Sequence, residues 1–300
     1  MYMVRFDGTV EKWATKLTTS SASDPPYLTS STDTTLRSFY IWWYAHNGRI
    51  SFDGSHYAGY YGAAVSVVQG GCVNIHQGDQ MRIVDLSGNP QSGGFTDFGC
   101  SHSSYERVVW DGTKFVPVCN NDGAASGKTG QIKFAGGPTI YPVNELNTDF
   151  GSVLKAGGGG YWVILSDIRP GQSTTSPGLD DVHLVHTTMG AFDKDMTLAN
   201  DPGLNDRAPH LAAFGKNRML AAWETSTAVD HLAQGDANRK LYVQALDNTT
   251  GAPQGSPYYV PGVTGSRYQD FRAYPDNSVA YAAPGSSATK IKILRIMPCP

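Results

Sequence analysis

The feature that most constrains this sequence is an internal repeat. In three places a β-rich run ends on an aromatic residue, turns on a short polar sequence, and is followed by a second β-rich run. The aromatic residues that end the first runs are Trp110, Phe214 and Tyr274. Two β-rich runs around a tight polar turn predict a β-hairpin. The three predicted hairpins span residues 103–119, 207–223 and 267–283, and weaker copies span 49–65 and 152–168.

A third β-rich run that leads into an acidic turn follows most of the hairpins. The predicted unit is therefore a hairpin, a third strand, a turn and a short fourth strand, recurring at roughly 50–60 residues. Four antiparallel strands at this period are typical of a β-propeller blade. The third-strand segments are residues 81–89, 183–193, 241–251 and 290–298, and the N-terminal residues 2–9 belong to the same class.

The predicted fold is all-β, a single β-propeller domain over residues 1–300 with five to seven four-stranded antiparallel blades. The composition agrees, because 34 glycines and 17 prolines favour turns and only 16% of residues carry charge. The chain begins and ends on a third strand, as expected if the two termini complete one blade. A pair of β-sandwiches is the alternative, and it is disfavoured because sandwiches do not repeat in this way.

This period resembles that of β-propellers of the sialidase-repeat and extracellular lectin type. The resemblance covers nearly the whole chain and rests on the strand period. The Asp-box pattern S-x-D-x-G-x-x-W is absent, and neither the single Trp-Asp pair at 110–111 nor the Gly-Gly pairs recur once per predicted blade, as WD and kelch repeats require. The resemblance therefore implies an architecture and no specific family, and it assigns no role to any residue.

Four cysteines are present, and one pair has a geometric argument for a disulfide. If the hairpin turns at Asp111-Gly112, Trp110 lies opposite Phe115 and Cys119 lies opposite Glu106. Cys100 then reaches Cys119 only if the chain folds back over the end of the sheet. A Cys100–Cys119 disulfide and four free thiols both remain open at this point. No CxxC spacing is present, so the cysteines do not predict a metal cluster.

Charge and hydropathy exclude two classes of partner. The net charge of −3 provides no basic surface for nucleic acid, and no run of 18 apolar residues predicts a membrane span. The first eight residues lack the basic flank and apolar run of a signal peptide. We expect a secreted or cell-surface protein, in agreement with the sequon at Asn248 and with the disulfide.

Aligning the three aromatic residues places polar side chains in matching columns. Glu106, His210 and Asp270 lie four residues before the aromatic, and Arg207 and Arg267 lie seven residues before it. Because the first strand of each blade lines the central channel, matching columns should converge on one axis. The predicted ligand-binding residues at this channel mouth are Arg207, Arg267, His102, His46 and Tyr44, and the candidate catalytic residues, if the protein is an enzyme, are His210, Tyr105, Glu106 and Asp270.

Three functions fit this predicted mouth. The first is lectin-like carbohydrate binding, because the 16 tyrosines and 6 tryptophans supply stacking faces and the charged groups bind hydroxyls. The second is a polysaccharide lyase or glycoside hydrolase that uses His, Tyr, Arg and carboxylates. The third is a protein-interaction scaffold, with the polar columns serving as ion pairs between blades. The expected partner is a glycan or another polar small ligand.

No cofactor is expected. Residues 123–130 approximate a phosphate-binding loop but have one residue too few and precede a strand, whereas that loop opens a helix. Structural Ca²⁺ at the polar turns 120–123 or 180–181 is left open, although such turns usually occur without a metal.

Overall fold

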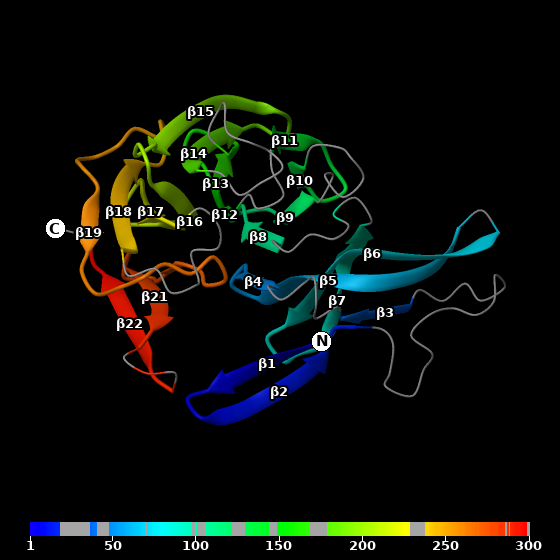
Figure 1. Ribbon diagram of the computed structural model, residues 1–300. Helices are drawn as coiled ribbons and strands as arrows, with labels where there is room; N and C mark the ends of the chain where they lie inside the picture. Colours follow the sequence, from blue (N-terminus) through cyan, green and yellow to red (C-terminus); the bar gives the residue numbers. More distant parts are fainter. Residues whose placement is uncertain are drawn as a thin grey trace. The chain divides into compact units, whose positions relative to one another are not determined.

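The computed structural model describes residues 1–18, 37–40, 48–69, 71–97, 100, 106–121, 130–143, 149–168, 179–228, 238–285, 287 and 289–298. All regular secondary structure in these residues is β-strand (Figure 1). The predicted fold class is confirmed: the chain is an all-β, five-bladed β-propeller. Five blades is the smallest of the numbers that the sequence allowed.

Each blade is an antiparallel sheet, and three of the blades have four strands. The strands follow in sequence order except in the first sheet, where the first two strands both pair with the third. One sheet contains β3 (Arg37–Tyr40), β4 (Arg49–Phe52), β5 (His56–Gln69), β6 (Cys72–Asp85) and β7 (Pro90–Asp97). The next contains β8 (Glu106–Trp110), β9 (Phe115–Asn121), β10 (Gln131–Phe134) and β11 (Thr139–Pro142). The third contains β12 (Phe150–Lys155), β13 (Tyr161–Ile168), β14 (Asp180–Thr187) and β15 (Phe192–Ala199). The fourth contains β16 (Asn205–Ala213), β17 (Arg218–Ser226), β18 (Lys240–Asp247) and β19 (Tyr258–Val260), and the fifth contains β20 (Arg272–Ala273), β21 (Val279–Pro284) and β22 (Ile291–Ile296).

The chain divides into two compact units. The N-terminal unit comprises residues 1–123 and 132–138, and the C-terminal unit comprises residues 124–131 and 139–300. We describe each unit by itself, and the single domain over residues 1–300 stays a prediction.

The five predicted hairpins are all present, as β4–β5, β8–β9, β12–β13, β16–β17 and β20–β21. In β8–β9 the register is the predicted one, with Trp110 opposite Phe115 and Glu106 opposite Cys119. The N-terminal segment behaves differently from the prediction. β1 (Tyr2–Asp7) turns directly into β2 (Val10–Lys16), and these strands form a two-stranded sheet among the described residues. The turn needs Gly8, which has φ +60°, a conformation that favours glycine.

Aspartates fix the turns that end many of these strands. The carboxylates of Asp53, Asp85, Asp111, Asp247 and Asp276 each accept a hydrogen bond from the backbone N–H two residues later. Such side-chain bonds replace backbone partners that a turn leaves unpaired. Hydrogen bonds chiefly from Asn89, Thr250 and Ser278 lower the pKa of the carboxyls of Asp85, Asp247 and Asp276, respectively. The acidic turns recognised in the sequence therefore have a structural role.

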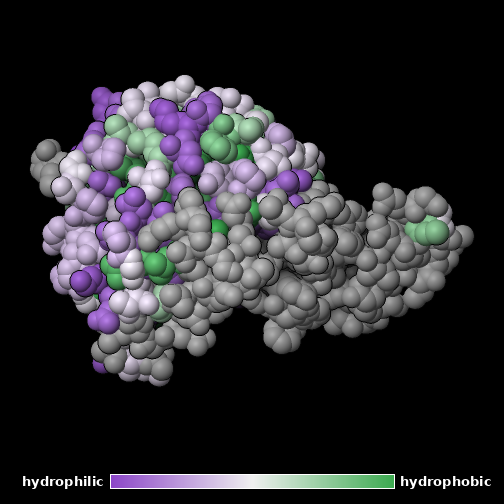
Figure 2. Space-filling view, turned by 45° about the horizontal axis from the view of Figure 1, so that its top comes forward, coloured by the Kyte–Doolittle hydropathy of each residue, from purple (hydrophilic) through white to green (hydrophobic). Residues whose placement is uncertain are grey.

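The C-terminal unit has two buried apolar clusters. One buried cluster surrounds Trp162 between the β12–β15 and β16–β19 sheets, and another surrounds Phe271 and Tyr281. Every residue of β13 is buried, whereas the outer strand β15 is largely exposed. Hydrophilic residues prevail over the described part of the face in Figure 2, with smaller hydrophobic patches between them. The inner and middle strands therefore make the core.

The N-terminal unit contains the predicted disulfide. Cys100 and Cys119 are bonded, fully buried, and have their Cα atoms 5.9 Å apart. The Tyr60 hydroxyl lies beside them, donating to Asp79 Oδ2 at 2.7 Å. The Cys100–Cys119 prediction is thus confirmed, while Cys72 is a free, exposed thiol.

Candidate functional site

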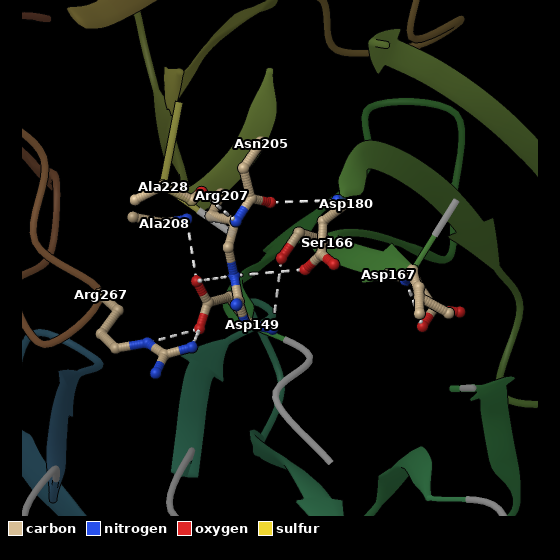
Figure 3. Close-up of polar contacts among 10 residues, drawn as sticks. Asp149, Ser166, Asp167, Asp180, Asn205, Arg207, Ala208, Ala228 and Arg267 are labelled. Atoms are coloured by element: carbon tan, nitrogen blue, oxygen red, sulfur yellow. Dashed lines mark hydrogen bonds and ion pairs between the residues drawn. The ribbon is translucent and has the colours of Figure 1, made fainter. Parts of the chain in front are cut away.

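The strongest candidate site lies in the C-terminal unit, where two inner strands begin. Asp149 comes immediately before β12, and Arg207 is the third residue of the neighbouring inner strand β16. Asp180 begins β14, and Arg267 precedes β20. These four charged residues form one chain of ion pairs, and we call it the Asp149 cluster (Figure 3).

Asp149 is the centre of the cluster. Its Oδ1 accepts a hydrogen bond from Arg267 Nε at 2.6 Å, and Arg267 Nη2 pairs with the same oxygen. Its Oδ2 accepts the backbone N–H of Ala208 at 2.9 Å and lies 3.5 Å from Arg207 Nε. Arg207 Nε also lies 3.2 Å from Asp180 Oδ2. Figure 3 shows Asp149 between the two arginine side chains.

A bulge in β16 makes this geometry. The pairing of β16 with β17 shifts between Arg207 and His210, and Ala208 has φ +50°, which is uncommon for a residue other than glycine. The bulge directs the Ala208 N–H at Asp149. It also brings the Pro209 carbonyl so close to β12 that a Cβ on Gly151 would lie 2.2 Å from that oxygen. Only glycine fits at Gly151 without a backbone shift.

Burial makes these charges depend on one another. The side chains of Asp149, Asp180 and Arg207 are at most 3% exposed, whereas that of Arg267 is 12% exposed. A buried charge carries a large desolvation cost unless it is paired. Here two carboxylates alternate with two guanidinium groups, so the charges balance, and Arg267 is the member nearest to solvent.

A second unusual carboxyl lies in the N-terminal unit. Glu106, the first residue of β8, is fully buried, and in the described part of the chain its carboxylate oxygens accept no hydrogen bond from another residue. Desolvation raises its pKa to about 7, although the backbone N–H of Glu106 itself and the positive charges of Arg107 and Arg49 oppose the shift. A carboxyl that titrates near neutral pH is suited to donating or accepting a proton.

The other predicted site residues have varied positions. His210 is buried, and its ring stacks on Phe271 at 5.1 Å between centroids, with Tyr281 at 5.5 Å. Asp270 pairs with Arg272 at 3.3 Å. The structure thus brings Arg207 and Arg267 together on the carboxylate of Asp149, whereas the His210 ring packs on two aromatic residues and Asp270 pairs with Arg272. Four predicted residues, Tyr44, His46, His102 and Tyr105, lie outside the described residues.

Sequence reasoning missed Asp149, although the sequence contained a usable pattern. The N–H of Ala156 bonds to the carbonyl four residues later, as do those of Phe214 and Tyr274 in their hairpins. Ala156 therefore occupies the aromatic position, and the residue seven places before it is Asp149. Asp149, Arg207 and Arg267 belong to one column. The pattern was hidden because alanine replaces the aromatic residue in this blade.

The described residues contain one group of three side chains close enough to share a metal ion, namely Asp79, Cys100 and Cys119. The two cysteines are joined by the disulfide. No helix in the described part of the chain has the length and hydrophobicity to cross a membrane.

No protein-family model and no curated protein matches this sequence. Solved structures do resemble it. A protein of unknown function from Dyadobacter fermentans has a TM-score of 0.48 at 12% identity, over 81% of this chain and 74% of that chain. An endo-arabinase from Bacteroides thetaiotaomicron has a TM-score of 0.44 at 12% identity, over 84% and 94%. An α-L-arabinanase from Penicillium chrysogenum, solved with arabinobiose, has a TM-score of 0.44 at 9% identity, over 83% and 82%. At these values the likeness carries over neither an activity nor a substrate.

Proposed function

We propose that this protein is an extracellular carbohydrate-binding β-propeller that binds its ligand at the Asp149 cluster. The observation that carries the proposal is the alternation of Arg267, Asp149, Arg207 and Asp180 at the starts of neighbouring strands. Apolar residues of similar volume would stabilise the fold as well as these ion pairs do, because burying charged groups carries a desolvation cost. A polar centre of this kind is therefore a candidate for binding.

The chemistry of the cluster suits a sugar. Vicinal hydroxyls both donate and accept hydrogen bonds, and a guanidinium group presents two parallel donors to such a pair. Arg267, the member with the most solvent exposure, makes the ligand contact in this proposal. Asp149 holds its guanidinium in place, and Arg207 holds Asp149. The disulfide supports the extracellular part of the proposal, because disulfides persist in oxidising compartments.

Substitution of Arg267 tests the proposal. The wild-type protein is screened on a glycan array, and affinities for the glycans it binds are measured by titration calorimetry. Arg267→Lys keeps the charge but loses the paired donors, so we expect at least a tenfold weaker affinity. Arg272→Ala is the matched control, because Arg272 lies five residues away and its side chain is 54% exposed. Equal affinity for Arg267→Lys and wild type, or an array without a bound glycan, contradicts the proposal.

Glu106 favours a second candidate function, cleavage of a polysaccharide. A buried carboxyl with a pKa near 7 is protonated in a large fraction of molecules at neutral pH and can protonate a leaving-group oxygen. The test is release of new reducing ends or unsaturated products from neutral and acidic polysaccharides. Glu106→Gln should abolish turnover without loss of folding, and the exposed Glu11→Gln should not. Turnover that persists in Glu106→Gln rejects this role.

A further inference from the structure

A cavity, separate from the Asp149 cluster, lies within the N-terminal unit. Its volume is about 380 Å³, and it is bounded by the β4–β5 turn, the β8–β9 hairpin and strands β6 and β7. We call it the Trp110 groove. Trp110 and Phe115 line it with their ring centroids 5.0 Å apart, and Met81 and Ile83 add apolar surface. A cavity of this size with aromatic and apolar walls falls in the range of small-ligand sites.

Two aspartate-fixed turns give the groove a rigid rim. Asp53 accepts the N–H groups of Ser55 and His56 in the β4–β5 turn. Asp111 accepts the N–H groups of Thr113 and Lys114 in the β8–β9 turn. Because β4 and β8 lie side by side, both turns reach the same cavity. Because the turn backbones are already fixed, they lose little freedom on binding, which favours affinity.

The rim supplies both donors and acceptors. His56 Nδ1 lies 3.0 Å from Asp53 Oδ2, so the ring is oriented by that contact and its Nε2 atom is the one left for a ligand. The amide nitrogen of Gln91 donates to the carbonyl of Asn89 at 3.1 Å, which leaves its Oε1 as an acceptor. Lys114 is exposed and adds a flexible donor. Apolar ring faces beside forked polar groups match a sugar, which has C–H faces and hydroxyl edges.

The surrounding charge selects against an acidic ligand. Asp53 lies in the groove wall, and Asp111 anchors the turn that carries Lys114. Among the described lining residues, Lys114 is the one lysine or arginine and Asp53 is the one carboxylate. An anionic group bound near Asp53 would be repelled by its carboxylate, so a neutral saccharide fits better.

We propose that the Trp110 groove is a binding site for a neutral saccharide, stacked on Trp110 and bonded to His56, Gln91 and Lys114. This site does not rest on the function proposed above. Trp110 is the last residue of β8 and Glu106 is the first, so the groove lies about 13 Å along the strand from that end. The protein thus contains a second, separate place for a glycan chain.

The test uses neutral linear tetrasaccharides of glucose, xylose, mannose, galactose and arabinose as probes, with the intact protein. Saturation-transfer NMR and calorimetry identify the probes that bind. Trp110→Ala should weaken binding of at least one probe about tenfold, because it removes the stacking face. Gln91→Ala, at an exposed rim position, should weaken the same probe severalfold and provides a test if Trp110→Ala fails to fold. Trp13→Ala is the matched control, because Trp13 lies in β2 and is not part of the lining.

The outcomes separate this site from the Asp149 cluster. Binding that falls in Trp110→Ala and Gln91→Ala but not in Arg267→Lys supports the groove whatever the fate of the cluster. Binding that falls only in Arg267→Lys overturns the groove and leaves the proposed function standing. The groove proposal is also overturned if no neutral probe binds at a concentration of about 10 mM, tenfold above a dissociation constant of roughly 1 mM, or if only acidic sugars bind.

Discussion

Glu106→Gln should make the protein more stable at alkaline pH and change little at acid pH. The native state holds a proton on Glu106 up to about pH 7, whereas an unperturbed glutamate loses it near 4.5. The native state therefore binds more protons than the unfolded state between these values, and its stability falls as the pH rises through this window. The difference in pKa corresponds to about 3 kcal/mol, of which roughly 2–3 kcal/mol is lost between pH 5 and pH 8.

Glutamine resembles the protonated acid and does not titrate. The free energy of unfolding, measured by chemical denaturation with the disulfide intact, should therefore be within about 1 kcal/mol of wild type at pH 5. The free energy of unfolding of Glu106→Gln minus that of wild type should be about 2 kcal/mol larger at pH 8 than at pH 5. The exposed Glu11→Gln serves as the control and should show no such change. A Glu106→Gln effect that is equal at the two pH values refutes the reasoning, because it means that Glu106 is ionised in the native state at both.

Three further predictions concern stability. Asp149→Asn leaves the two arginines without their shared negative charge, so it should lower the free energy of unfolding, measured by denaturant titration, by about 3–5 kcal/mol. A loss below about 1 kcal/mol would mean that the cluster is solvated. Gly151→Ala should lower the melting temperature strongly, because its Cβ would lie 2.2 Å from a carbonyl oxygen of β16. Gly190→Ala should not lower it, because a Cβ there meets no atom within 4 Å. Equal melting temperatures for the two variants would disprove the close approach at Gly151. Replacing Cys100 and Cys119 by serine should cost about 3 kcal/mol through loop closure, and reductant should then have no further effect on stability.

The sequence by itself determined the fold class and the hairpins, and it identified Cys100 and Cys119 as a candidate pair while leaving four free thiols open. These features depend on local chemistry: the β-rich runs, the Asp-Gly turn and the repeat period specify antiparallel pairs without reference to the rest of the chain. Because the turn at Asp111 sets the register of β8 and β9, the sequence alone placed Cys119 opposite Glu106.

Only the tertiary structure decided which polar residues meet. Arg207 and Arg267 were recognised from their column, but Asp149 was missed because Ala156 replaces the aromatic that defines the alignment. The same column pattern does not predict the bulge at Ala208, which turns a backbone N–H toward Asp149. His210 fits its predicted column and yet stacks on Phe271. Local sequence fixes the pairing of strands within a hairpin. The partners of a buried charge come instead from segments more than 50 residues apart in the chain, and they are known only once those segments pack. The charge needs such partners because its desolvation is costly unless it is paired.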